Sequence, residues 1–346
     1  MSKVAIIGKY NTVAGIADGQ AIKTRIITRQ IGQRFGTNNV DQIDTYNWKK
    51  HPLRLVRKSV QAVRKSGHVI FMTDEGGIKV FPWLLRYANV AGKCRLHYVV
   101  VGGWLIHFLK KHSFISACLK KFAGIYVETT VMQRALEVQG FQNVVLLPNC
   151  KPLEPVSRRH LREQYAPPFR FCTFSRVMKE KGIDDAVDAV RMINHRFSSA
   201  VCTLDIYGQV DPKQREWFAS LQESFPPEVR YCGVIDYEKS VAVLQDYFAL
   251  LFPTEFFTEG IPGTVIDAYA AGVPVIAARW ESFADVIDEG ETGVGYPFGE
   301  QQSLQQIMLS LIEEPQRIVD MKENCLHKAQ QYMPSNVMQT LLSRLS

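Results

Sequence analysis

Short apolar runs alternate along nearly the whole chain with longer stretches in which apolar residues recur every three or four positions. The runs are typical of buried parallel strands and the longer periodicity of amphipathic helices, so the pattern predicts repeated strand–helix units. A first set of strands is predicted at Val4–Gly8, Val40–Ile43, His68–Met72, His97–Val101, Gly124–Glu128 and Val144–Leu147. A second set is predicted at Phe171–Phe174, Cys202–Tyr207, Val229–Cys232, Phe248–Phe252 and Val273–Ala277.

Two sets of parallel strands joined by helices predict an α/β fold with two Rossmann-like parallel-sheet domains. A Pro-rich stretch over residues 148–155 separates the sets, so we expect one domain over 1–150 and a second over 151–333. Pro334 breaks the pattern before an amphipathic segment, which predicts a terminal helix over 334–346. A length of 346 residues with 46% apolar content is sufficient for two packed cores.

Residues 253–277 predict a ligand site, because a strand end, a Gly/Pro loop, a helix and a second buried strand follow one another there. Glu259 lies in the loop, and Asp267 follows about one turn inside the helix. The exposed N–H groups of the first helical turn, on Gly263, Thr264 and Val265, are expected to face an anion. A phosphate between two carboxylates is therefore predicted, the alternative being an ordinary capped crossover.

Two cations follow an earlier strand and point to the same chemistry. Arg176 and Lys181 come after the strand Phe171–Phe174 and before a helix predicted from Asp184 to Ile193. Cations at the carboxyl end of a parallel strand can stabilise the negative charge of a departing diphosphate. Alone, such residues are usually solvated surface charges, but Glu259 about 80 residues further on favours the functional interpretation.

These residues together resemble the Glu-x7-Glu signature of the retaining nucleotide-sugar glycosyltransferases of family four, the group 1 glycosyltransferases, with Asp267 in place of the second Glu. The resemblance implies the GT-B architecture, in which two Rossmann-like domains face a central cleft. It implies that the first domain binds the acceptor, that the second binds the nucleotide sugar, and that the terminal helix crosses back to the first. It assigns Glu259 to the donor sugar, Asp267 to the ribose, and Arg176 and Lys181 to the diphosphate.

Further positions match the family less specifically. Gly208 ends a strand where the family lets the diphosphate and base approach the backbone, Val234 lies in the base-edge segment, and Gly15 lies in the long first loop near the donor phosphate. Each is also compatible with an ordinary turn. Where many relatives place an active-site His, this chain has Gly102-Gly103-Trp104; His107, one turn into the next helix, is an alternative, although a lone helical His is more often structural.

The activity implied by the resemblance is transfer of a hexosyl group, with retention, from a UDP- or GDP-linked sugar to an acceptor hydroxyl, in bacterial surface polysaccharide assembly. No resident cofactor is implied. No Asp-x-Asp metal motif is present, so we expect Arg176 and Lys181, rather than a divalent ion, to balance the diphosphate charge. No side chain is placed as a nucleophile, which agrees with front-face chemistry in which the departing phosphate receives the acceptor proton.

The charge is unevenly distributed. Residues 1–150 contain 22 Lys and Arg against 7 Asp and Glu, a net charge of +15, and the remainder carries −8 within the overall +7. A basic acceptor domain predicts an anionic, lipid-pyrophosphate-linked acceptor or an acidic membrane surface. Two segments, one over 105–122 and one over 54–65, combine basic with apolar residues and could lie at a bilayer interface, the alternative being a solvated face over a core stripe.

The chain shows no run of 18 apolar residues, no signal peptide before its first strand, and seven scattered cysteines without paired spacing. We therefore expect a cytoplasmic protein, peripheral on the inner face of the membrane, that does not bind nucleic acid. Two alternatives remain. A nucleotide-sugar epimerase would need acid and base side chains at the sugar, and a non-catalytic basic membrane-associated protein would leave Arg176, Lys181 and Glu259 without a role.

Overall fold

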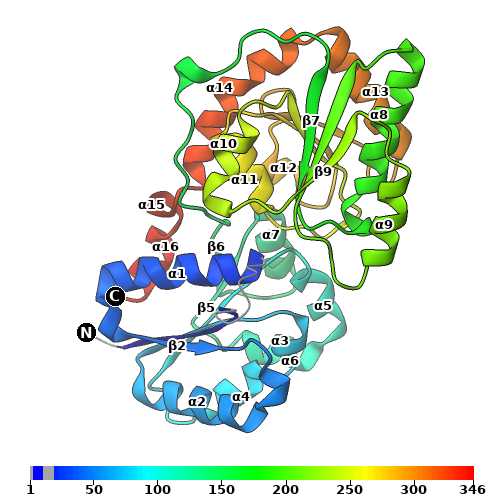
Figure 1. Cartoon of the computed structure of the whole chain (residues 1–346). Coiled ribbons are helices and arrows are strands. Elements are labelled where there is room, and N and C mark those ends of the chain that lie inside the picture. Colours follow the sequence, from blue (N-terminus) through cyan, green and yellow to red (C-terminus); the bar gives the residue numbers. More distant parts are fainter. Residues whose placement is uncertain (1–2, 11–18) are drawn as a thin grey trace. The chain divides into compact units, whose positions relative to one another are not determined.

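The structure is a computed structural model and describes residues 3–10 and 19–346 (Figure 1). The chain divides into two compact units, here called the first unit (Met1–Pro152 with Tyr332–Ser346) and the second unit (Leu153–Gln331). The chain therefore leaves the first unit after Pro152 and returns to it at Tyr332. Each unit has its own sheet, its own helices and its own apolar clusters.

The first unit is built on a six-stranded parallel sheet in the order β2-β1-β3-β4-β5-β6. Its strands are β1 (Val4–Gly8), β2 (Val40–Asp44), β3 (His68–Met72), β4 (Arg95–Val99), β5 (Gly124–Val127) and β6 (Val144–Leu146). The helices between them are α1 (Gly19–Phe35), α2 (Pro52–Lys65), α3 (Glu75–Ile78), α4 (Phe81–Ala88), α5 (Leu105–Lys111), α6 (Ser113–Leu119) and α7 (Thr130–Val138).

Two apolar clusters cover the two faces of this sheet, because successive strand residues point to opposite sides. Ile6 joins a cluster with α1 and with residues of the C-terminal helices α15 (Pro334–Val337) and α16 (Gln339–Arg344). Ile7 joins the other cluster, which contains core residues of α2, α4, α5 and α6. In Figure 1, α1 accordingly lies on one side of the sheet, and α2 and α4 lie on the other.

The second unit is also a six-stranded parallel sheet, in the order β12-β11-β10-β7-β8-β9. Its strands are β7 (Phe169–Phe174), β8 (Cys202–Tyr207), β9 (Val229–Gly233), β10 (Ala249–Phe252), β11 (Val275–Ala278) and β12 (Gly293–Tyr296). Its helices are α8 (Ile183–Phe197), α9 (Arg215–Glu223), α10 (Ser240–Leu244), α11 (Gly263–Ala270), α12 (Phe283–Val286), α13 (Gln301–Glu313) and α14 (Gln316–Gln331).

The predicted fold class, two Rossmann-like parallel sheets, is confirmed, with two local differences. β12 was not predicted, because Gly-Val-Gly-Tyr is short and glycine is uncommon in strands. The basic segment 105–122 is not one helix: it breaks at His112, whose backbone is non-helical, into α5 and α6. In the part of the chain that the structure describes, we find no helix with the length and apolar composition needed to span a bilayer.

Candidate active site

The loops that follow β7 and β8 hold each other at the carboxyl edge of the second sheet. The N–H of Ser175 donates to the carbonyl of Tyr207. Two further bonds of 2.9 Å follow, from the N–H of Val177 to the carbonyl of Gln209 and from the N–H of Asp211 to the carbonyl of Val177. Residues 175–177 are therefore fixed by the loop after β8, as in a short continuation of the sheet.

Two glycines allow the loops at this edge to approach closely. Gly208 has φ 134°, and a Cβ there would lie 1.7 Å from the carbonyl oxygen of Ser175. Gly182 has φ 64°, and a Cβ there would lie 2.0 Å from the carbonyl oxygen of Pro253, directly after β10. Any other residue would force these backbones apart, so the predicted Gly208 and the unpredicted Gly182 set the spacing of the three loops.

The predicted residues Lys181 and Glu259 come together here. The Nζ of Lys181 forms an ion pair with Oε1 of Glu259, and the two side chains are 16% and 17% exposed. The same ammonium lies 5.3 Å from the ring centroid of Phe252 and 5.0 Å from that of Phe256. The hydroxyl of Thr254 donates to Glu259 Oε1 at 3.3 Å. A carboxylate and two aromatic faces thus hold the cation in a partly buried position.

Arg176 lies on the same loop as Lys181 but has a different partner. Its Nη1 is 3.6 Å from Oδ2 of Asp211, and its side chain is 48% exposed. Lys181 and Glu259 are therefore brought together, whereas the guanidinium of Arg176 faces the loop after β8. Because its ion pair is long and exposed, Arg176 is held only weakly there.

The side chain of Gln214, which the sequence analysis did not single out, supports the loop that carries Lys181. Gln214 accepts a bond from the N–H of Lys179 at 2.7 Å and donates one to Oε2 of Glu180 at 2.7 Å. The carbonyl of Glu180 in turn accepts from the N–H of Glu255. Gln214 lies 35 positions from Lys179, so no local sequence pattern could have indicated this contact.

The start of α11 provides unused hydrogen-bond donors. The residue before the helix is Pro262, which gives no side-chain cap. The N–H of Val265 donates to the carbonyl of Pro262 at 3.1 Å. The N–H groups of Gly263 and Thr264 find no acceptor within residues 3–10 and 19–346, and over the same residues the buried hydroxyl of Thr264 has no partner. Unpaired donors and the positive end of the helix dipole favour an anion here.

The predicted ribose and base positions differ strongly in exposure. Asp267 is 2% exposed, inside α11. Val234 is 67% exposed and directly follows β9. The segment before Val234 is tied to Gly208, because the N–H of Gly208 donates to the carbonyl of Gly233 at 2.8 Å and the hydroxyl of Tyr231 donates to the carbonyl of Gly208 at 2.9 Å.

Three further predicted positions belong to the first unit. Gly15 lies outside the described residues. In the loop after β4, the indole of Trp104 donates to the carbonyl of Val101 at 3.0 Å, and His107 lies in the first turn of α5.

The start of α8, next to the Lys181 loop, carries unusual electrostatics. Burial and, after it, the negative charges of Asp184, Glu255 and Asp188 together raise the pKa of Asp185 to about 7. Glu255 belongs to the loop after β10 that also carries Glu259. Protonation of Asp185 is therefore coupled to the charge on the loop that positions Glu259.

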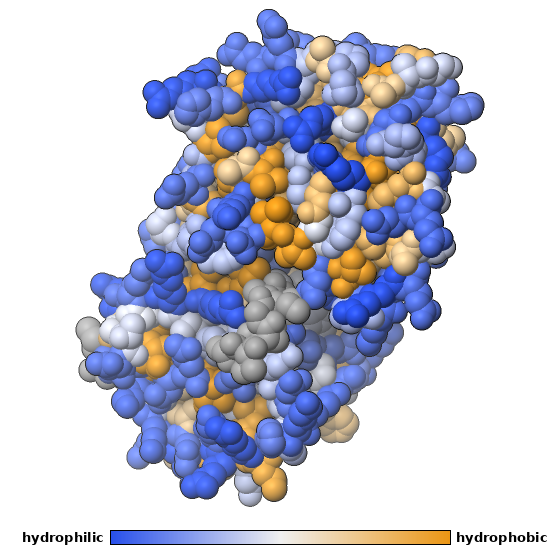
Figure 2. Space-filling view, viewed as in Figure 1, coloured by the Kyte–Doolittle hydropathy of each residue, from blue (hydrophilic) through white to orange (hydrophobic). Residues whose placement is uncertain are grey.

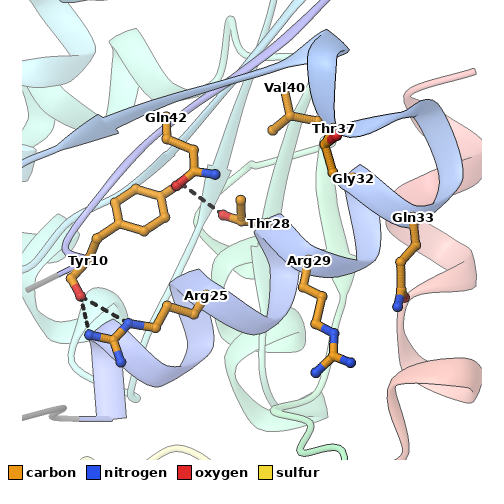
Figure 3. A pocket seen from close by; sticks show the side chains of 9 residues that line it. All are labelled: Tyr10, Arg25, Thr28, Arg29, Gly32, Gln33, Thr37, Val40 and Gln42. Carbon is orange, nitrogen blue, oxygen red and sulfur yellow. Dashed lines mark hydrogen bonds between the residues drawn. The ribbon is translucent and has the colours of Figure 1, made fainter. Parts of the chain in front are cut away.

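A separate pocket of about 380 Å³ lies in the first unit, between α1 and β2 (Figure 3). Its walls include Tyr10 and Gln42 on one side and Arg25 and Arg29 of α1 on the other. Arg25 donates two bonds to the carbonyl of Tyr10, at 3.0 and 2.6 Å. None of the predicted site residues that the structure describes lines this pocket, so we do not include it in the candidate site.

Over the two described stretches of chain, no three His, Cys, Asp or Glu side chains are close enough to hold an ion.

Two parallel six-stranded sheets of Rossmann type define the class of the fold, that of the GT-B glycosyltransferases. HepE of Anabaena, solved in complex with UDP-glucose, has the same fold with a TM-score of 0.76, 16% identity, and coverage of 100% of this chain and 99% of the other. Sucrose-phosphate synthase from Thermosynechococcus elongatus has a TM-score of 0.78 at 16% identity, with coverage of 100% and 99%. At this identity the likeness shows the fold alone.

Residues 168–314 match the model of the family described as glycosyl transferases group 1, which confirms the resemblance predicted from the sequence. The chain is 29% identical over 175 residues to the D-rhamnosyltransferase WbpZ of Pseudomonas aeruginosa, covering 49% of this chain and 43% of the relative. It is 25% identical over 157 residues to the amylovoran biosynthesis glycosyltransferase AmsK of Erwinia amylovora, covering 44% and 38%. The chain thus matches less than half the length of either relative.

Proposed function

We propose that this protein transfers a hexosyl group, with retention and without a metal, from a nucleoside diphosphate sugar linked to uridine or guanosine to an acceptor hydroxyl, in bacterial surface polysaccharide assembly. The observation that carries the proposal is the Lys181–Glu259 pair at the carboxyl edge of the second sheet. The same unit contains the start of α11, where the N–H groups of Gly263 and Thr264 have no acceptor among the described residues. Similarity to a rhamnosyltransferase and to an amylovoran biosynthesis glycosyltransferase supports it, as does the UDP-glucose bound to HepE.

The proposed roles follow from the chemistry of each group. The diphosphate accepts from the N–H groups of Gly263 and Thr264 and from Lys181, which stabilises the charge that develops as the sugar–phosphate bond breaks. Glu259 accepts from hydroxyls of the sugar, and Asp267 from the ribose. Arg176 reaches the diphosphate by leaving Asp211, to which it is weakly bound.

Retention is consistent with the state of Glu259. Its carboxylate is paired with Lys181 and accepts from Thr254, which suits a hydroxyl-binding group and lowers its strength as a nucleophile. In the proposed reaction the sugar–phosphate bond breaks, the acceptor oxygen bonds to the same face of the sugar, and the acceptor proton passes to the departing phosphate. Positioning and leaving-group stabilisation then account for catalysis.

The proposed acceptor is an anionic glycan, linked to a lipid pyrophosphate at the inner face of the membrane. The net charge of +15 over residues 1–150 supports an anionic partner for the first unit. It also supports a peripheral location on an acidic membrane surface.

The experiment begins with thermal shifts for a panel of nucleoside diphosphates and their sugars. A ligand at 100-fold its Kd adds about 2.7 kcal/mol to stability, so the accepted donor should stand out. The accepted sugar is then used in a transfer assay with Lys181→Ala, which should lower turnover by about 10²-fold. Lys179→Ala is the matched control, since this exposed Lys lies in the same turn and its ammonium forms no hydrogen bond or ion pair within the described residues.

Two results would overturn the assignment. Full activity in Lys181→Ala would remove the phosphate role from Lys181. Strict dependence of activity on a divalent ion, abolished by EDTA and restored by Mg²⁺, would show that a metal balances the diphosphate. Retention itself is checked from the anomeric configuration of the product by NMR.

A further inference from the structure

The helix α4 carries apolar side chains on two sides, and one of these sides packs into the core of the first unit. Its inner side contributes Phe81 and Leu85, which are 2% and 0% exposed, to the core of the first unit. Its outer side carries Trp83 and Tyr87, which are four positions apart, the spacing of one helix face, and Val80 and Val90 flank the two ends of the helix. This outer stripe consists of Val80 (43% exposed), Trp83 (45%), Tyr87 (82%) and Val90 (80%).

Neighbouring helices extend this exposed apolar surface. α4 packs against both α2 and α6. Leu53 in the first turn of α2 is 84% exposed, and Phe114 in α6 is 77% exposed. These positions and the outer stripe of α4 are here called the α2–α4–α6 face. Among the residues that the structure describes, no packing contact explains why these large apolar side chains are exposed.

The surroundings of this face are almost free of negative charge. Between Thr45 and Val127 the chain contains 15 Lys and Arg but two acidic residues, Asp74 and Glu75. None of α2, α4, α5 and α6 contains an acidic residue. Exposed cations on α2, α4 and α6 and on their flanks include Arg54, Arg57, Lys58, Arg64, Lys65, Arg86, Lys93, Lys111 and Lys120.

The face lies on the side of the first sheet opposite α1, where α2 and α4 are drawn in Figure 1. In the same region of Figure 2, strongly hydrophilic residues surround isolated hydrophobic ones. Interleaved cations and apolar side chains differ from a protein–protein interface, whose core is depleted of charge. They match the boundary of a bilayer, where phosphates lie above acyl chains and aromatic rings are enriched.

We infer that the α2–α4–α6 face docks the first unit onto an anionic lipid bilayer. Trp83 and Tyr87 enter the headgroup boundary, and the cations of α2 and α6 contact lipid phosphates. The inference deepens the proposed function, since it names the surface that would reach a membrane-borne acceptor. Docking itself needs no nucleotide, so the two proposals can fail separately.

The experiment measures sedimentation of the full chain with vesicles, either of phosphatidylcholine alone or of equal parts phosphatidylcholine and phosphatidylglycerol. We expect binding to the acidic vesicles only, weakening as salt shortens the Debye length to about 8 Å. Trp83→Ser with Tyr87→Ser should weaken binding about tenfold or more, because two partly buried aromatic contacts are lost. Val138→Ser is the control, because it removes an exposed apolar side chain outside this face. Val138 lies on α7 and is 89% exposed.

A second set of variants tests how positive charge contributes to vesicle binding, and it compares two double substitutions. Arg57→Gln with Lys58→Gln should weaken binding by about fivefold per charge. Arg29→Gln with Arg34→Gln removes the same charge from α1, on the opposite side of the sheet, and should have a smaller effect. The Trp83→Phe variant should still bind acidic vesicles. It should lose the lipid-induced blue shift of tryptophan fluorescence and the quenching by brominated lipid, because these two signals identify Trp83 at the boundary.

Three outcomes would overturn the inference. These are equal binding to both vesicle types, acidic-vesicle binding that the Trp83 and Tyr87 substitutions leave unchanged, and self-association abolished by Tyr87→Ser without any vesicle binding. The last would identify a second copy of the chain as the occupant. In each case a parallel titration with the accepted nucleoside diphosphate reports on the second unit, so loss of docking is distinguished from failure of the proposed function.

Discussion

At the scale of single residues, the charge of Lys181 has two competing partners. The structure pairs it with Glu259 in a partly buried position between two aromatic rings. In the proposed reaction, the donor diphosphate takes part of that charge. Breaking a buried pair is costly because the remaining charge is left uncompensated, so the two members of this pair should respond differently to substitution.

We therefore expect a split between binding and turnover. Glu259→Gln removes the competing charge and frees Lys181, so nucleoside diphosphate affinity should hold or rise while turnover falls by about 10²-fold, because sugar hydroxyls lose their acceptor. Lys181→Met should weaken nucleoside diphosphate binding itself. Isothermal titration with the nucleotide and steady-state kinetics with the sugar donor separate the two effects. Equal loss of affinity in both variants would contradict this division of roles.

A second prediction for a single residue concerns the proposed contact between the carboxylate of Asp267 and the ribose of the nucleotide. Asp267→Asn keeps the shape of a buried side chain and removes its negative charge, so it should cost about 1–3 kcal/mol of nucleoside diphosphate binding. The matched ligand is the 2′-deoxy nucleotide, whose affinity should change less if the carboxylate accepts from the 2′-hydroxyl. A thermodynamic cycle over the two proteins and two ligands isolates the contact. Additive effects would exclude it.

The sequence predicted which polar residues follow the strands at the candidate site. It did not predict which side chains they contact. Lys181 and Glu259 could be chosen because chemistry gathers at the carboxyl ends of parallel strands. The ion pair of Arg176 with Asp211 and the support from Gln214 connect separate loops. Such contacts depend on which strands are neighbours in the sheet, and local sequence does not contain that information.

At the scale of elements, the three loops beside β7, β8 and β10 depend on backbone contacts that only glycine allows. Gly208→Ala should destabilise the second unit by more than about 2 kcal/mol and weaken nucleotide binding, because its Cβ would overlap the Ser175 carbonyl. Gly299→Ala is the control: its φ is 82°, yet nothing lies within 4 Å of the added Cβ. It should cost about 1 kcal/mol through backbone strain alone. Urea unfolding compares them, and equal losses would contradict the overlap.

The start of α8 provides a pH prediction. Asp185 keeps its proton in the folded chain up to about pH 7, whereas the ordinary pKa is 3.8. Between these values the folded state binds more protons than the unfolded state, so this group makes stability fall as pH rises through the window. Asp185→Asn should remove that slope in urea unfolding when it is compared with the unsubstituted chain over the same pH range. An unchanged slope in Asp185→Asn would contradict the raised pKa.

Helices and strands with strong apolar runs could be predicted from the sequence. Features that depend on neighbouring elements of the fold could not. Most strands were found within about two residues, because β-branched residues recur in them. β12 was missed, since Gly293–Tyr296 acquires its strand conformation by pairing with β11. The outer stripe of α4 was also missed, because periodicity shows that a helix has apolar sides but does not show which of them the fold covers.

At the scale of the whole molecule, the first unit is made from two separate parts of the chain. Val337, Met338, Leu341 and Leu345 are buried in one cluster with α1, although some 300 residues separate them in sequence. The second unit is inserted between these parts. Stability of the first unit therefore depends on residues encoded after the second.

Leu341→Ala tests this dependence. Leu341 is 0% exposed, so the substitution should lower the free energy of unfolding of the first unit by about 2–5 kcal/mol. Thr340→Ala, at an exposed neighbouring position, should have almost no effect. Nucleotide affinity, which belongs to the second unit in the proposed function, should stay unchanged in both. A matching loss of nucleotide affinity in Leu341→Ala would show that the units do not behave separately.

The inserted arrangement has a consequence for how the protein is made. A ribosome completes all of Leu153–Gln331 before it adds Tyr332–Ser346. Until then, the apolar side of α1 lacks the cover that α15 and α16 provide in the finished chain. The half of the molecule that is translated first is thus the half that folds to completion last, and a nascent chain stalled before Tyr332 would present that side of α1 to chaperones.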